Sequence, residues 1–206
     1  MINMTNIKKH YNDKLYDIAH RDYEKGEIVL LGDCVIENLN IEEEFNNKII
    51  YNNGISGDTT ILLLETLYKR AIKYKPEKLF ISIGSNDIGF NHTTVKDIYH
   101  NIIEIIKEVQ KRSKETEIYI CTVVPVNPAN KDYINREYVD ARDNFEINML
   151  NYYLKNYARR NRIKFVDVSK HLSNDIDQLN INYTFDGFHL NDLGNQMIVD
   201  LIKQYV

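Results

Sequence analysis

The sequence predicts an α/β protein in which a parallel sheet of five strands is covered by helices on both faces. Five short apolar runs of strand length are separated by segments whose apolar residues recur at helical spacing. Runs that are apolar throughout are typical of parallel strands, because both faces of a parallel sheet are buried. The predicted strands are residues 28–32, 48–52, 79–84, 117–124 and 163–167.

Predicted helices lie between the strands and at both ends of the chain. Residues 1–25 contain the first helix, which we expect to pack on the rest of one domain spanning residues 1–206. Residues 58–73 form the second, which ends before Pro76 and for which Asp58 is the predicted N-cap. The other predicted helices follow apolar positions within residues 95–109, 139–157 and 193–202.

The charge and hydropathy of the chain argue against two classes of partner. Its 206 residues include 26 basic and 30 acidic side chains, for a net charge of −4, whereas nucleic-acid binding normally requires a basic excess. The longest aliphatic run, residues 61–64, is far shorter than a membrane-spanning helix. The N-terminus also lacks the pattern of a secretory signal peptide. We therefore expect a cytoplasmic protein that binds neither nucleic acid nor membrane.

No metal or cofactor motif stands out in the sequence. Two cysteines are too few for a disulfide framework, and no His, Cys and Asp cluster has the spacing of metal ligands. A phosphate-binding loop and the dinucleotide-binding fingerprint are absent, although a sheet of this type could hold a flavin. A cysteine-dependent phosphatase is also disfavoured, because no Arg follows Cys34 within residues 35–40. We expect neither a metal nor a cofactor.

Polar motifs follow three of the predicted strands and precede the last helix. Ligands of parallel α/β sheets bind outside the carboxyl ends of the strands, so chemistry is expected at these positions. A candidate nucleophile, candidate oxyanion donors and an Asp-x-x-His pair therefore fall on loops that the fold brings together. The motifs are Gly32-Asp33-Cys34, Asn52-Asn53-Gly54-Ile55-Ser56-Gly57-Asp58, Gly84-Ser85-Asn86-Asp87 and Asp186-Gly187-Phe188-His189.

These motifs resemble those of the SGNH hydrolases, also called GDSL-type esterases and acylhydrolases. That family is marked by a Ser in Gly-Asp-Ser, a Gly in the second motif, an Asn in Gly-x-Asn-Asp and a His in Asp-x-x-His. This chain carries the four motifs in the same order, from about residue 28 to the C-terminus, with Cys34 in place of the Ser. The resemblance implies a flavodoxin-like, three-layer α/β/α sandwich.

The resemblance also implies a role for each motif. Cys34 would be the nucleophile, His189 the general base and acid, and Asp186 the group that orients the imidazole. On physical grounds alone, an Asp three residues before a His can reach its Nδ1–H, which leaves Nε2 free to face the nucleophile. The implied oxyanion hole consists of the Cys34 N–H, the Gly54 N–H and the Asn86 side-chain amide.

The implied activity is hydrolysis of a small-molecule acyl ester without metal or cofactor. Small or sugar-borne acyl esters and thioesters are the expected substrates, and residues 125–140 are expected to contribute to the substrate site. Cys34 is predicted to begin a short helix whose N-terminus, with the partner imidazolium, favours the thiolate, while Asp33 opposes it. Because Cys replaces Ser, a relative that binds an acyl or glycan ligand with little or no turnover is the alternative.

Overall fold

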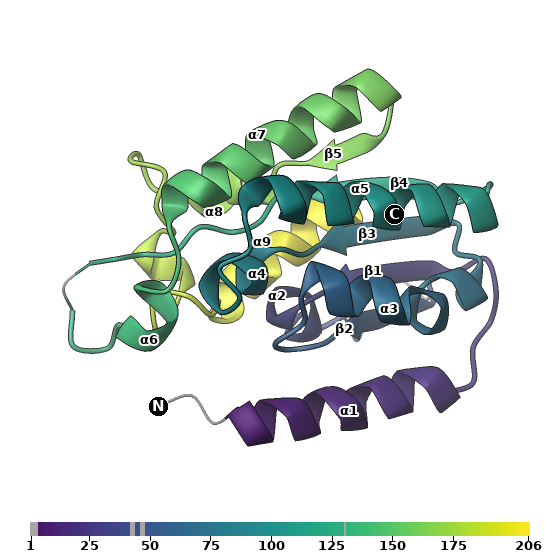
Figure 1. Cartoon of the computed structure of the whole chain (residues 1–206), viewed down its shortest axis with the longest axis horizontal. Coiled ribbons are helices and arrows are strands. Elements are labelled where there is room, and N and C mark those ends of the chain that lie inside the picture. The colour runs from purple at the N-terminus through teal and green to yellow at the C-terminus, as the bar shows by residue number, and fades with distance from the viewer. Residues whose placement is uncertain (1–3, 42–43, 46–47, 130) are drawn as a thin grey trace.

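The computed structural model describes residues 4–41, 44–45, 48–129 and 131–206, and it contains a five-stranded sheet between two layers of helices (Figure 1). The strand order is β2-β1-β3-β4-β5, and all neighbours are parallel. This arrangement confirms the predicted α/β/α fold. The strands are β1 (Ile28–Gly32), β2 (Ile50–Gly54), β3 (Lys78–Ser82), β4 (Glu117–Cys121) and β5 (Lys164–Val166).

Both faces of the central strands are buried, which explains why these strands are apolar throughout. In β1, Val29 and Leu31 pack into the core on one face of the sheet, while Ile28 and Leu30 pack into the core on the other. Successive side chains of a strand point to opposite faces, and β3 and β4 alternate in the same way. The sheet therefore separates two apolar cores.

Different helices cover the two faces of the sheet (Figure 1). Helices α3, α5 and α7 contribute to the first core, and α2, α8 and α9 to the second. Within the described ranges, no helix has the length and apolar character needed to cross a membrane. The helices are α1 (Met4–His20), α2 (Cys34–Glu37), α3 (Thr60–Arg70), η1 (Ile72–Tyr74), α4 (Ser85–Gly89), α5 (Val95–Arg112), α6 (Arg136–Val139), α7 (Asn144–Asn161), α8 (Val168–Leu172), η2 (Ile181–Tyr183) and α9 (Asp192–Lys203).

The N-terminal helix α1 lies beside α3 and contacts α2 and the polar motif that follows β2 (Figure 1). His10 Nε2 is 2.9 Å from Oε1 of Glu37, the last residue of α2, and Lys14 Nζ is 3.5 Å from the same oxygen. The Tyr11 hydroxyl donates to Asp58 Oδ1 at 3.3 Å. These contacts hold α1 against the loops that follow β1 and β2.

Several predicted boundaries differ from the observed ones. Strand β2 begins and ends later than the predicted strand 48–52, because its ladder with β1 continues to a pair of facing glycines. The predicted strands 79–84 and 117–124 are longer than β3 and β4, since their last residues leave the sheet and enter the polar loops. The predicted helix 139–157 is divided between the end of α6 and most of α7.

The second predicted helix, residues 58–73, is divided into α3 and η1, and its predicted N-cap at Asp58 is wrong. Thr59 is the N-cap, and its side-chain oxygen accepts a hydrogen bond from Leu62 N at 3.4 Å. The Asp58 carboxylate accepts from Thr59 N and forms an ion pair with Arg70. The prediction failed because the sequence does not show that Asp58 pairs with Arg70, the last residue of the same helix, while the Thr59 side chain caps the first turn.

Candidate active site

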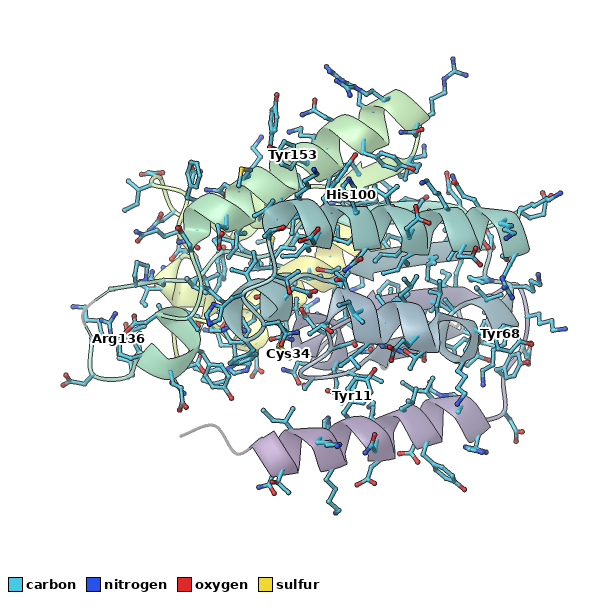
Figure 2. All side chains as sticks on the ribbon, viewed as in Figure 1. Tyr11, Cys34, Tyr68, His100, Arg136 and Tyr153 are labelled. Atoms are coloured by element: carbon cyan, nitrogen blue, oxygen red, sulfur yellow. The ribbon has the colours of Figure 1, made fainter. Side chains whose placement is uncertain are left out.

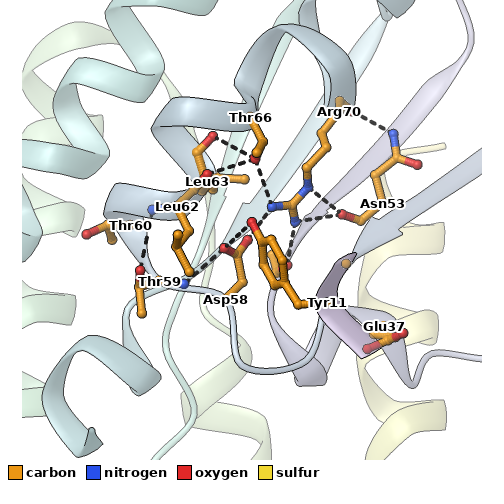
Figure 3. Close-up of polar contacts among 12 residues, drawn as sticks. Tyr11, Glu37, Asn53, Asp58, Thr59, Thr60, Leu62, Leu63, Thr66 and Arg70 are labelled. Atoms are coloured by element: carbon orange, nitrogen blue, oxygen red, sulfur yellow. Dashed lines mark hydrogen bonds and ion pairs between the residues drawn. The ribbon is translucent and has the colours of Figure 1, made fainter. Parts of the chain in front are cut away.

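A buried arginine fixes the carboxyl ends of β1 and β2, where two of the polar motifs lie (Figure 3). Arg70 is fully buried, and its guanidinium donates to the carbonyl oxygens of Gly32 at 2.9 Å and Asn53 at 2.8 Å. The same guanidinium forms an ion pair with the buried carboxylate of Asp58. A buried charge requires a partner and hydrogen bonds, and this geometry supplies both. Arg70 therefore joins both strand ends to the loop over residues 55–58.

The predicted Asp-x-x-His pair is formed. His189 Nδ1 lies 2.7 Å from Asp186 Oδ2, while Asp186 Oδ1 accepts from the backbone N–H groups of Phe188 at 2.9 Å and His189 at 2.7 Å. Burial works against ionisation, but these hydrogen bonds and the imidazole hold the pKa of Asp186 below its ordinary value. The positive φ of Gly187, +88°, allows the turn that brings the pair together. The geometry leaves Nε2 of His189 available for proton transfer.

Cys34 begins α2, as predicted, and its side chain lies in the interior of the molecule (Figure 2). Its exposed fraction is 5%, and it packs in a small apolar cluster with Phe188 and with residues of the 125–140 segment. Among the described residues, no hydrogen bond joins the thiol to His189. Phe188 shares the apolar cluster with Cys34, and Tyr138 packs against that cluster. The centres of these two rings lie 4.6 Å and 4.8 Å from the centre of the His189 ring.

The thiol of Cys34 does not have the lowered pKa that its helix position predicted. Burial raises the pKa of Cys34 well above its ordinary value, the Asp33 carboxylate adds to the rise, and the Arg142 guanidinium opposes it. Helix α2 has only four residues, so its dipole cannot offset this desolvation. At rest Cys34 is therefore a neutral thiol, and a base would have to remove its proton before the sulfur could act as a nucleophile.

Asn86, the third predicted oxyanion donor, has a side chain that is 2% exposed. Its Nδ2 donates to the carbonyl oxygen of Asp58 at 2.9 Å, and its Oδ1 accepts from Nη2 of Arg142 at 2.9 Å. A carboxamide nitrogen carries two hydrogens, so one N–H remains for a further acceptor. Asn86 therefore retains one N–H donor that the expected oxyanion role would need.

Gly54, one of the three predicted oxyanion donors, is buried against α2. Its N–H already donates to Asn52 Oδ1 at 3.0 Å, and the residue is buried under α2. A Cβ at this position would lie 2.3 Å from Glu37 N, so glycine is required here for packing. Gly57, by contrast, is partly exposed, and among the described residues its N–H has no hydrogen-bond acceptor. Gly57 stands in the same sequence motif, but spacing alone could not distinguish the two glycines.

Sequence reasoning missed Arg142 altogether. It lies outside every motif described above, between α6 and α7, and its Nη2 donates to Asn86, a residue 56 positions earlier in the chain. Its Nε also donates to Ser85 Oγ at 2.9 Å. No feature of the sequence distinguishes this arginine from the exposed ones.

Asp33, the N-cap of α2, is expected to make the free energy of unfolding depend on pH. Its carboxyl is 3% exposed, and burial raises its pKa from 3.8 to about 7, although the hydrogen bond from Val35 N opposes the rise. The pKa of Asp33 is higher in the folded state than in the unfolded state, so the protonated carboxyl favours the folded state. This contribution to the free energy of unfolding is complete below about pH 4 and is lost as the pH rises toward about 7. Asp33→Asn keeps an oxygen for Val35 N and removes the charge. We expect it to raise the free energy of unfolding by about 4 kcal/mol at about pH 8 and to change it little at about pH 4.

Denaturant unfolding at several pH values measures this effect, with the exposed Asp140→Asn as the matched control. Equal pH slopes for wild type and Asp33→Asn would contradict the raised pKa of Asp33.

The comparison with protein families decides the assignment. The GDSL-like lipase/acylhydrolase family matches residues 30–197, which is most of the chain. The chain belongs to this family. Membership supports ester hydrolysis as its general activity, and it fits the order of the motifs around Cys34 and His189.

Several solved structures share the same fold. A Streptococcus pneumonia protein described as a candidate platelet activating factor is 30% identical, with a TM-score of 0.87 over 98% of this chain and 94% of that one. A catalytic mutant of an acetylxylan esterase from Geobacillus stearothermophilus is 15% identical, with a TM-score of 0.66 over 89% of this chain and 95% of that one. The second likeness concerns the fold alone.

Among curated proteins, an N-acylneuraminate cytidylyltransferase of Escherichia coli O18:K1:H7 is 28% identical over 181 residues. The match covers 87% of this chain and 40% of that protein. The chain thus spans well under half the length of this relative.

Proposed function

We propose that this chain hydrolyses acyl esters, with Cys34 as nucleophile, His189 as base and acid, and Asp186 as the group that orients the imidazole. The observation that carries the proposal is the 2.7 Å hydrogen bond between His189 and Asp186, on a turn whose Phe188 packs in the same cluster as Cys34. General-base catalysis requires an imidazole held in one tautomer beside the nucleophile, and this turn supplies that tautomer.

In the proposed first step, Nε2 of His189 takes the thiol proton as Sγ of Cys34 bonds to the ester carbonyl carbon. The carbonyl electrons move to the oxygen, which accepts hydrogen bonds from the Cys34 N–H, the Asn86 Nδ2–H and the Gly57 N–H. When the carbonyl re-forms, the C–O bond to the alcohol breaks and His189 protonates the departing oxygen. The products are the free alcohol and an acyl-thioester on Cys34.

In the second step, His189 removes a proton from water as the water oxygen attacks the acyl-thioester. The C–S bond then breaks, the sulfur regains its proton from His189, and the carboxylic acid leaves. A neutral buried thiol makes the base essential in the first step, because little thiolate is present before substrate binds.

We propose that the preferred substrates carry small or activated acyl groups, including sugar-borne esters. A thiolate leaves a tetrahedral adduct more readily than an alkoxide does, so an alkyl ester reacts only if His189 protonates the alcohol in time. Thioesters and aryl esters avoid this difficulty. The small apolar cluster around Cys34 favours short acyl chains. The name of one similar protein concerns an acylated sugar, N-acylneuraminate.

Intact-mass analysis after exposure to para-nitrophenyl acetate tests the proposal. We expect one acetyl group on the wild type, mapped to Cys34, and none on Cys34→Ala. Cys121→Ala is the matched control, because Cys121 is also buried but packs in the core on the other side of the sheet from α3 and α5. Cys121→Ala should be acylated like the wild type. Acylation that persists in Cys34→Ala would exclude Cys34 as the nucleophile.

One observation favours a second candidate function, binding of an acyl or glycan ligand without turnover. The thiol is buried, its pKa is raised, and within the described ranges it has no hydrogen bond to His189. In that case, iodoacetamide would label Cys34 slowly near neutral pH, and His189→Ala would leave the rate unchanged. If Cys34 is the nucleophile, labelling is faster in the wild type than in His189→Ala.

A further inference from the structure

Arg142 is a buried cation that has no acidic partner at close range. Its side chain is 6% exposed, and among the residues described no carboxylate lies within ion-pair distance of its guanidinium. All three of its hydrogen bonds go to uncharged acceptors, namely Ser85 Oγ at 2.9 Å, Asn86 Oδ1 at 2.9 Å and the Tyr138 carbonyl oxygen at 2.6 Å. Burial of a charge without an ion pair costs free energy. We therefore expect the Arg142 guanidinium to serve a function that offsets this cost.

Aromatic packing fixes the plane of this guanidinium. Its Cζ lies 3.8 Å from the centre of the Phe188 ring and 4.8 Å from that of the Phe90 ring. Gly89 in α4 provides the space, because a Cβ there would lie 2.7 Å from Cζ of Arg142. A guanidinium held by two rings and three acceptors has one orientation, unlike a flexible surface arginine.

The groups near Arg142 are those of the proposed active site. Its positive charge acts on the Cys34 thiol, on the Asp33 and Asp186 carboxyls and on the Tyr138 hydroxyl. Burial lowers the pKa of Arg142, while the negative forms of these neighbours oppose that fall. Asp186 is already hydrogen-bonded to His189, and the pKa of Asp33 is raised to about 7 by burial. Neither carboxyl therefore balances the guanidinium fully.

We propose that Arg142 is the positioning residue of this active site: it holds the Asn86 carboxamide toward the substrate oxygen, and its charge stabilises the anion that forms during the reaction. The hydrogen bond to Oδ1 fixes the carboxamide plane, which leaves one Nδ2–H directed away from Asp58. The role in hydrolysis rests on the proposed function. The effect on the Cys34 thiolate does not, because it can be measured without any ester.

Three variants separate charge from geometry. Arg142→Gln removes the charge, Arg142→Lys keeps the charge but loses the planar fork, and Gly89→Ala displaces the guanidinium while retaining it. Arg159→Gln is the matched control, because Arg159 is an exposed arginine of α7 outside the proposed site.

The first measurement is the rate of Cys34 alkylation by iodoacetamide as a function of pH. If the charge stabilises the thiolate, the midpoint should rise by about one pH unit in Arg142→Gln and less in Arg142→Lys, and it should stay unchanged in Arg159→Gln. An unchanged midpoint in a folded Arg142→Gln variant would overturn the electrostatic part of the proposal. This readout stands even if the protein hydrolyses no ester, so it distinguishes failure of the inference from failure of the proposed function.

The second measurement is the steady-state hydrolysis of para-nitrophenyl acetate. We expect kcat to fall about 100-fold in Arg142→Gln, as for loss of an oxyanion donor, and by a smaller factor in Arg142→Lys and Gly89→Ala, with KM nearly constant in all three. Wild-type kcat in both Arg142→Lys and Gly89→Ala would overturn the positioning role. A fall in kcat that Arg159→Gln shares would likewise count against it, because the loss would then be general.

Discussion

His189→Ala is expected to lower kcat for hydrolysis of an activated ester by about 10³- to 10⁴-fold, with KM almost unchanged. The physical reason is the protonation state of Cys34, the proposed nucleophile. Burial keeps Cys34 as a neutral thiol, so the reaction depends on a base that takes its proton when the substrate is attacked. Steady-state kinetics with para-nitrophenyl acetate measure both parameters, and circular dichroism confirms that the variant is folded.

Two further variants sharpen this result. Asp186→Asn retains the size of the side chain but can present an amide to Nδ1, so we expect an intermediate loss caused by the wrong imidazole tautomer. His171→Ala, at an exposed position of α8, is the matched control and should behave as wild type. If His189→Ala retained wild-type kcat, the proposed mechanism would be excluded whatever the state of Cys34.

Arg70→Met is expected to lower the free energy of unfolding by about 3–5 kcal/mol, which is a large part of the stability of an ordinary domain. The substitution leaves the Asp58 carboxylate buried without its ion pair, and it removes the hydrogen bonds that the guanidinium donates to the carbonyl oxygens of Gly32 and Asn53. Urea unfolding followed by circular dichroism measures the change.

The cause of that loss can be isolated with a double-mutant cycle. If the unpaired carboxylate is the main penalty, adding Asp58→Asn to Arg70→Met should recover part of the lost stability. Arg159→Met, at an exposed position of α7, controls for removal of any arginine and should change stability by less than about 0.5 kcal/mol. Equal losses in Arg70→Met and Arg159→Met would contradict the role assigned to the buried ion pair.

The turn that carries Asp186 and His189 could be predicted from the sequence, whereas the surroundings of the two candidate oxyanion glycines could not. Asp186 and His189 are three residues apart, and the chain between them is short enough that spacing alone predicts their hydrogen bond. Gly54 and Gly57 share one motif, but the first faces α2 and the second is partly exposed. The difference depends on how a neighbouring helix packs, which no local pattern records.

The sequence by itself determined the sheet, the helices around it and the order of the motifs at its carboxyl edge, because strand and helix periods are local properties of the chain. Only the tertiary structure decided the ionisation of the cysteine and the roles of the two buried arginines. Desolvation depends on every group that surrounds a charge, and Arg70 and Arg142 meet partners up to 38 and 57 positions away in the sequence. Electrostatics in a buried site is therefore a property of the folded chain.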